Sequence, residues 1–149
     1  MPRRPNCALL KENTGLAEPS RLSPTLLLLS DDEALTDLVR PIVERPWSLV
    51  RHGADRYTSH KVFTQPNVRL VILDDQAVVE ADRSWLLAQI RKHFSGAPLL
   101  YVASIQSDSN EKQARANGAH YYASKPLSVE RFGGVLRSFL QVQQIKDTT

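Results

Sequence analysis

The sequence predicts an α/β domain built on a doubly wound, five-stranded parallel sheet. Short apolar runs without polar alternation alternate with segments of helical periodicity, and a strand that helices cover on both faces has this apolar character. The clearest run is residues 70–73, which ends in two carboxylates, Asp74 and Asp75. Alternating strands and helices predict right-handed crossovers and the strand order 2-1-3-4-5. In such a sheet ligands bind at the carboxyl ends of the strands, where these two acids lie.

Composition limits the classes of protein to consider. The chain has 149 residues, enough for one domain with a sizeable core, and its single cysteine, Cys7, excludes an internal disulfide. The net charge of +3 comes largely from the first two dozen residues, so nucleic-acid binding has little support. No apolar run approaches the roughly 20 residues that span a bilayer, and no signal-peptide core is present. We therefore expect a soluble cytoplasmic protein with neither a nucleic-acid nor a membrane partner.

The first part of the chain predicts an arm, a strand and a helix. Residues 1–24 contain four prolines and no sustained periodicity, so we interpret them as a flexible N-terminal arm. Residues 25–29 form the first apolar strand, and the following Ser-Asp-Asp can cap a helix by accepting bonds from its free amides. Apolar residues at helical spacing follow over residues 35–43. Pro41 interrupts that helix and should kink or shorten it.

The remaining elements alternate in the same way. The expected strands are residues 47–51, 70–74, 98–103 and 119–123, and the expected helices are residues 53–65, 81–94 and 108–117 and one that begins near Ser128. The helix at 108–117 has Ala114 as its main apolar anchor, which predicts a loosely held element. Trp85 and Val142 are expected on the inner faces of their helices. These assignments place the domain at residues 25–142 and a C-terminal tail at residues 143–149.

Polar residues from four strands should converge at one edge of this sheet. The topology brings Asp31, Asp74, Ala103, Ser104 and Lys125 around a single shallow pocket. Two carboxylates and a backbone oxygen suit a hard divalent ion such as Mg²⁺. A lysine in the same place supplies a point charge for phosphate oxygens. The expected chemistry is the transfer of a phosphoryl group to a carboxylate as an acyl phosphate.

Residues 25–140 resemble the receiver domain of two-component response regulators. The pieces that carry the resemblance are residues 28–31, the strand over residues 70–74, Gly118-Ala119 and residues 122–126. The resemblance implies a flavodoxin-like, receiver-like fold and a Mg²⁺ cofactor. It also implies a histidine kinase or phosphotransfer protein as one partner, and a downstream protein docked on the face made by the fourth helix, fifth strand and fifth helix. Pairing of two copies through the fourth helix is a further possibility.

The resemblance also implies a role for individual residues. Asp74 falls at the position of the phosphoacceptor, and Lys125 at that of the lysine that contacts the phosphoryl group. Asp31 and Asp74, with the backbone carbonyl of Gln76, fall at the metal-binding positions. Tyr122 lies at the position of the family's aromatic switch.

Several positions depart from the family's pattern. Ser30 stands where the first of two acids is usual, which should weaken Mg²⁺ binding, and the pair Asp31-Asp32 fits these positions only with a one-residue shift. The switch hydroxyl expected after strand four falls on Ala103, and Ser104 lies one position late, where a side chain points to the other face. The loop after Asp74 lacks the family's usual Met-Pro and Asp-Gly. Asp75 is expected to be a solvent-facing neighbour.

Three functions remain open on the sequence. The first is a receiver that is phosphorylated on Asp74, and the second is a pseudo-receiver that binds partners without phosphorylation. The third, a small aspartate-nucleophile phosphatase, is disfavoured because Gln76 occupies the place of its general acid. Nucleotide-binding loops are absent from the sequence, and we expect no enzyme activity. Only residues 141–149 follow Leu140, so the sequence as given leaves no room for an output domain. Two alternatives stay open: the protein stands alone and acts by docking, or this chain is a piece of a longer one.

Overall fold

The sheet has the expected parallel topology. The structure, a computed structural model, describes residues 23–53 and 60–148. Its five-stranded sheet has the order β3-β2-β4-β5-β6, which is 2-1-3-4-5 in chain order, and all neighbouring strands are parallel. The strands are β2 Thr25–Leu29, β3 Ser48–His52, β4 Val68–Asp74, β5 Leu99–Ala103 and β6 Ala119–Ser124. The predicted fold class and strand order are therefore confirmed.

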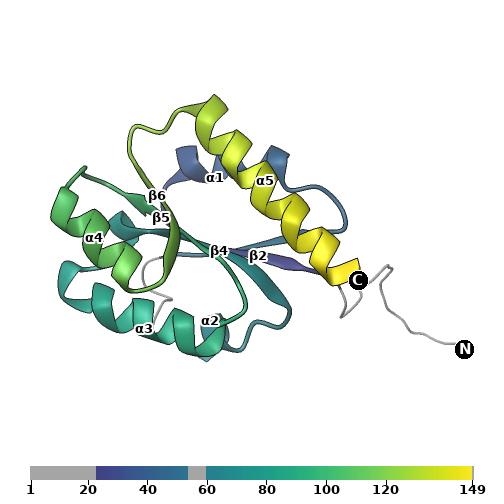
Figure 1. Cartoon of the computed structure of the whole chain (residues 1–149), viewed down its shortest axis with the longest axis horizontal. Coiled ribbons are helices and arrows are strands. Elements are labelled where there is room, and N and C mark those ends of the chain that lie inside the picture. The colour runs from purple at the N-terminus through teal and green to yellow at the C-terminus, as the bar shows by residue number, and fades with distance from the viewer. Residues whose placement is uncertain (1–22, 54–59, 149) are drawn as a thin grey trace, which may run out of the picture.

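Helices cover both faces of the sheet. Figure 1 shows α1 and α5 on one face and α2, α3 and α4 on the other. The helices are α1 Glu33–Val39, α2 His60–Phe63, α3 Arg83–His93, α4 Asp108–Ala116 and α5 Val129–Thr148, with short 3₁₀ helices η2 Arg40–Ile42, η4 Asp75–Ala77 and η5 Glu80–Asp82. None of the helices over residues 23–53 and 60–148 has the length and apolar character needed to cross a membrane.

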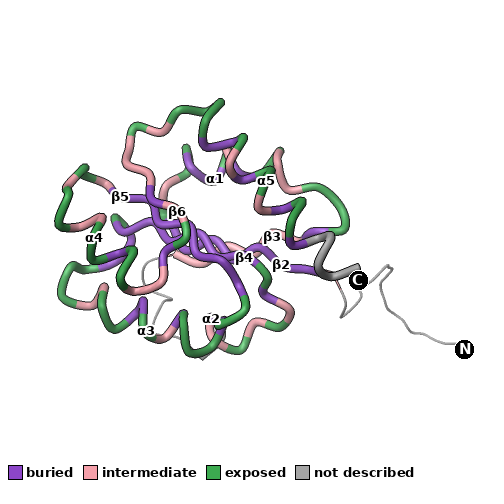
Figure 2. The backbone as a smooth tube through the Cα atoms, in the orientation of Figure 1, coloured by how far each residue is buried: buried purple, intermediate pink, exposed green. Residues whose placement is uncertain are grey.

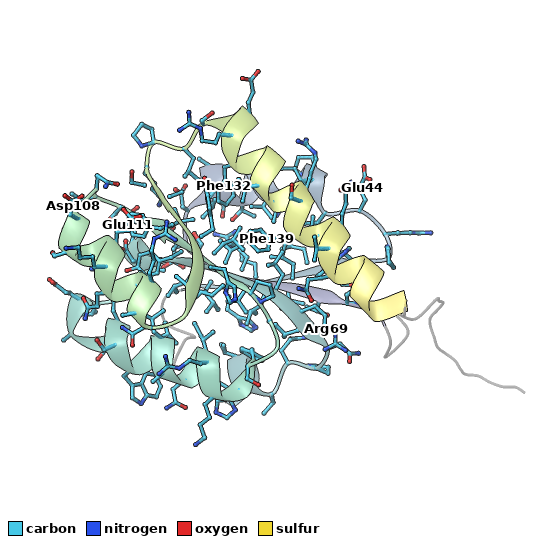
Figure 3. All side chains as sticks on the ribbon, viewed as in Figure 1. Glu44, Arg69, Asp108, Glu111, Phe132 and Phe139 are labelled. Carbon is cyan, nitrogen blue, oxygen red and sulfur yellow. The ribbon has the colours of Figure 1, made fainter. Side chains whose placement is uncertain are left out.

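Two apolar clusters, one on each face, form the core. Successive side chains of a strand point to opposite faces, so neighbouring residues of β4 enter different clusters. Leu70 and Ile72 pack with Phe132 and Leu136 of α5, while the alternate β4 residues Val71 and Leu73 pack with Leu86 and Ile90 of α3. In Figure 2 the strands at the centre of the molecule are correspondingly buried. Figure 3 shows the labelled Phe132 and Phe139 of α5 directed toward the sheet.

The ends of two helices follow from single residues. Helix α1 stops at Val39 and continues as the 3₁₀ helix Arg40–Ile42, because Pro41 cannot donate a backbone hydrogen bond. Helix α4 ends before Gly118, whose φ of 106° lies in the left-handed region that glycine adopts without a steric penalty. Both ends agree with the sequence prediction.

Some boundaries and inner faces differ from the prediction. Trp85 is 46% exposed, because the buried face of α3 is formed by Leu86, Leu87 and Ile90, and its ring makes an edge contact with Phe63. Val142 is 49% exposed, so it does not belong to the inner face of α5. Helix α5 continues to Thr148 and includes most of the stretch expected as a tail. Of the helix expected over residues 53–65, the structure gives His60–Phe63, and residues 54–59 lie outside the described part, as does nearly all of the expected arm at 1–24.

Candidate functional site

Asp74 lies at the carboxyl end of β4 and is surrounded by hydrogen-bond donors. Its side chain is 1% exposed. Ser30 Oγ donates to Asp74 Oδ2 at 2.7 Å, and Lys125 Nζ reaches the same oxygen at 2.9 Å. The other oxygen, Oδ1, accepts from the backbone amide of Gln76 at 3.1 Å. Burying a carboxylate costs free energy unless hydrogen bonds replace its lost hydration, and Asp74 has such partners on both oxygens.

Lys125 links three acceptors at the mouth of the site. Its Nζ lies 2.8 Å from Asp32 Oδ2, 2.9 Å from Asp74 Oδ2 and 2.8 Å from Gln76 Oε1. Burial by itself lowers the pKa of Lys125, but hydrogen bonds to Asp32 and Asp74 and their negative charges outweigh burial and raise it. The hydrogen bond from Lys125 is in turn the main cause that lowers the pKa of Asp32. At neutral pH, Lys125 is therefore an ammonium held at the expected phosphoacceptor.

Asp32, rather than Asp31, makes the direct ion pair with this lysine. Asp32 is also the N-cap of α1, where its Oδ1 accepts from the amides of Ala34 and Leu35. One carboxylate thus caps a helix with one oxygen and binds Lys125 with the other. The sequence offered Asp32 as a helix cap and, with a one-residue shift, as the second acid of the pair Asp31-Asp32. The ion pair itself could not be foreseen, because it depends on the fold bringing Lys125, which follows β6, to the start of α1.

A cavity of about 450 Å³ opens beside Asp74. It is lined by Asp31, Asp32, Glu33, Asp74, Gln76 and Ala77. The fold thus brings together Asp31, Asp74 and Gln76, the three residues predicted to hold a metal. Carboxylate and carbonyl oxygens suit Mg²⁺, which needs only one or two carboxylates and keeps several waters. No group of three or more acidic, histidine or cysteine side chains arranged for metal binding occurs in the described ranges. The donor set fits Mg²⁺ with few protein ligands, and the individual metal assignments stay predictions.

Asp75 is buried, contrary to the expectation that it faces solvent. It is 1% exposed. Tyr101 Oη donates to its Oδ2 at 2.9 Å, the Ser104 amide donates to its Oδ1 at 2.8 Å, and Asn110 Nδ2 lies 3.4 Å from Oδ2. Arg83 Nη1 adds an ion pair at 3.8 Å. The cause is the two-residue period of the strand, because the phase that directs Asp74 toward Lys125 directs Asp75 toward α3 and α4.

The three positions assigned to switching lie beside this second carboxylate. Ala103 is fully buried and offers no hydroxyl, while Ser104 contributes its backbone amide to Asp75. Tyr122 is 8% exposed, stacks on Tyr101 with 5.5 Å between ring centroids, and accepts from Asn110 Nδ2 at 3.3 Å. Burial, reinforced by the Asp75 carboxylate, raises the pKa of Tyr101, so its phenol remains a donor. A switching role for these residues stays a prediction.

This chain is similar to a curated protein in sequence and to many solved structures in fold. No protein-family model matches the chain. The chain is 29% identical over 112 residues to the transcriptional regulatory protein KdpE of Staphylococcus aureus, a match that covers 75% of this chain and 48% of the relative. The chain therefore spans about half the length of the curated relative that it matches.

Solved structures of similar fold have much lower sequence identity. A CheY-like receiver domain from Methanospirillum hungatei superposes with a TM-score of 0.65 at 20% identity, covering 83% of this chain and 98% of that one. A two-component response regulator from Clostridium difficile gives 0.64 at 20% identity, with 79% and 96% covered. The receiver domain of the Francisella response regulator 1452 gives 0.62 at 18% identity, with 79% and 97% covered. At these identities the likeness is one of fold.

Proposed function

The chain has the receiver fold of two-component response regulators, and from this premise we propose that it accepts a phosphoryl group on Asp74 from a histidine kinase or phosphotransfer protein. The observation that carries the proposal is the placement of Lys125 Nζ 2.9 Å from Asp74 Oδ2, beside a cavity that Asp31 and Gln76 also line. A cation at the acceptor oxygen and an open space beside it are the two features that phosphoryl transfer to a carboxylate requires.

The residues of the site divide the work of the transfer. An oxygen of Asp74 attacks phosphorus, so that a carboxylate oxygen to phosphorus bond forms while the donor's bond to phosphorus breaks. Lys125 then faces the phosphoryl oxygens with its positive charge. Asp31, Asp74 and the Gln76 carbonyl would hold Mg²⁺, which neutralises charge on a transferring phosphoryl group when bound. Ser30 and the Gln76 amide orient the acceptor carboxylate before the transfer.

Intact mass after incubation with Mg²⁺ and acetyl phosphate tests this proposal. The wild-type chain should gain one phosphoryl group, and Asp74→Asn should gain none. Asp37→Asn is the matched control, because Asp37 is a surface carboxylate of α1 that pairs with Arg40 outside the site, and it should be labelled like the wild type. Undiminished labelling of Asp74→Asn would remove Asp74 as the acceptor.

A second candidate function is a pseudo-receiver that binds partners without phosphorylation. It is favoured by Ser30, whose hydroxyl joins the Lys125 ammonium as a second donor to Asp74 Oδ2, at a position where an acid would favour a metal ion. A calorimetric Mg²⁺ titration of the wild type and of Ser30→Asp separates the two candidates. If only Ser30→Asp binds Mg²⁺ and is labelled by acetyl phosphate, the wild-type chain works without phosphorylation. If both are labelled, the receiver proposal stands.

Signalling by this chain would occur through protein docking on the face formed by α4, β6 and α5. That face carries a largely polar hollow of about 330 Å³ lined by residues that include Glu111, Tyr121 and Arg131. Either a downstream protein or a second copy could occupy it, and light scattering with and without phosphorylation would distinguish a homodimer from a monomer. The phosphatase alternative has no support, because Gln76 is hydrogen-bonded to Lys125 through Oε1 and cannot serve as a general acid.

A further inference from the structure

The second buried carboxylate points to a role of its own. We propose that Asp75 is a positioning residue that fixes the start of the loop after β5 and, through Asn110, holds Tyr122 and α4 against the end of β4. In a phosphorylated protein this network would connect the Asp74 site to α4, and that part of the inference rests on the proposed function. The positioning itself does not, because it concerns contacts that exist before any phosphoryl group arrives.

Asp74 and Asp75 are adjacent in the chain but serve opposite faces of the sheet. One peptide bond joins Asp74 to Asp75, but their side chains contact different elements. Asp74 contacts Ser30, which follows β2, and Lys125, which follows β6. The Asp75 side chain contacts groups on the α3 and α4 face. A change in backbone position at Asp74 therefore moves an anchor on the opposite face of the sheet.

Helix α4 depends on polar contacts for its position. Ala114 is its only buried residue, so apolar packing holds this helix weakly. Asn110 Nδ2 reaches both Asp75 Oδ2 at 3.4 Å and the Tyr122 hydroxyl at 3.3 Å. Through this one amide, the Asp75 carboxylate sets where α4 lies and where the Tyr122 ring sits.

Ser104 and Arg83 also lie next to the Asp75 carboxylate. Ala103 has no hydroxyl to carry a signal, but the next residue, Ser104, gives its backbone amide to Asp75 at 2.8 Å. Arg83 Nη1 lies at 3.8 Å, longer than a direct hydrogen bond, and the buried Nε of Arg83 has no hydrogen-bond partner among the described residues. Arg83 Nη2 also lies 3.5 Å from the backbone carbonyl oxygen of Asp75, so a closer pair with the carboxylate is within reach of Arg83 if Asp75 moves.

Two variants and one control test the positioning. Asp75→Asn keeps the shape of the side chain and removes its charge, and Asn110→Ala removes the link to Tyr122. Gln113→Ala is the control, because Gln113 lies on the same helix but bonds to Ser84, outside the network. We expect amide hydrogen exchange at Ser104 and across α4 to accelerate about tenfold in Asp75→Asn, the size of one lost charge-assisted bond. The control should leave exchange at Ser104 unchanged.

A spectroscopic readout distinguishes positioning from general loosening. In protein labelled with 3-fluorotyrosine, the ¹⁹F signal of Tyr122 can be assigned by its loss in Tyr122→Phe. Asp75→Asn and Asn110→Ala should shift this signal in the same direction, and the double variant should shift it no further. If Asp75→Asn proves too unstable to study, Asn110→Ala alone decides, since an unmoved Tyr122 signal in that variant would overturn the inference.

Failure of this inference and failure of the proposed function give different results. Suppose that the wild type gains a phosphoryl group and that phosphorylation shifts its Tyr122 ¹⁹F signal. If phosphorylation shifts the signal equally in Asp75→Asn, then Asp75 does not link the Asp74 site to Tyr122 and α4, and the proposed function stands. If the wild type gains no phosphoryl group, the proposed function fails. Amide hydrogen exchange in the unphosphorylated variants still tests the positioning role of Asp75. Normal exchange at Ser104 in Asp75→Asn would overturn that role, and accelerated exchange would support it.

Discussion

Asp74 and Asp75 are consecutive and equally buried, but their surroundings differ. Asp74 contacts an ammonium, a hydroxyl and an amide and borders a cavity of about 450 Å³. Asp75 is enclosed by Tyr101, Ser104 and Asn110, with Arg83 at 3.8 Å. Burial therefore does not identify the reactive carboxylate. The open space and the cation beside Asp74 favour chemistry there, whereas the filled surroundings of Asp75 favour a structural role.

The largest expected difference between the two carboxylates is in how much each contributes to the free energy of unfolding. Asp75→Ala should lower the free energy of unfolding by about 3 kcal/mol, because it leaves the buried donors of Tyr101 and Ser104 without an acceptor. Asp74→Asn should change it by less than about 1 kcal/mol, since the amide oxygen can still accept and Asp32 still pairs with Lys125. Urea unfolding of both variants measures the difference. Equal losses would contradict the division between a structural and a chemical carboxylate.

Tyr101→Phe should give a smaller loss, about 1 kcal/mol near neutral pH, because one hydrogen bond to Asp75 disappears. The pKa of Tyr101 is raised in the folded protein above its ordinary value of 10.0. The unfolded chain therefore loses this proton first, and the stabilisation from Tyr101 is complete below pH 10 and declines above it. Unfolding measured from neutral to alkaline pH should show the wild type converging on Tyr101→Phe. A constant difference would mean that the phenol is not held protonated.

Asp32→Asn should have the smallest effect, below about 1 kcal/mol, since asparagine also caps helices and the ion pair with Lys125 is partly exposed. The pKa of Asp32 is lowered below its ordinary value of 3.8, mainly by the hydrogen bond from Lys125. Its contribution to stability is thus present above pH 3.8 and is lost as the pH falls through the folded-state pKa. Thermal unfolding at neutral and acidic pH should show the two proteins becoming alike in acid. A gap that widens there would contradict this sign.

The sequence allowed the sheet and the edge of the site to be predicted because local patterns determine them. Apolar runs identified the strands, and Pro41 and Gly118 marked the ends of two helices. Strand topology then sufficed to bring Asp74 and Lys125 together, at 2.9 Å. These features need only the order of the elements, which periodicity reveals.

The environment of Asp75 could not be predicted in the same way. An acid one residue beyond a strand can face solvent or the core. Its orientation depends on whether hydrogen-bond donors from distant elements reach it. Tyr101 and Asn110 are those donors, and they lie 26 and 35 residues away in the chain. A signal was present, because Tyr101 interrupts an aliphatic strand with a polar group that needs a partner when buried. Recognising it required the register between β4 and β5, which pairs Leu73 with Tyr101.

Locating the phosphoryl group on one of the two adjacent acids tests the central assignment most directly. Borohydride reduces an aspartyl phosphate to homoserine, and trypsin, which cleaves after Arg69 and Arg83, releases residues 70–83 as one peptide. After incubation with acetyl phosphate and Mg²⁺, fragmentation of that peptide should place homoserine at position 74 and leave Asp75 intact. Homoserine at position 75, or in another peptide with Asp74 unchanged, would contradict the assignment of Asp74 as the phosphoacceptor.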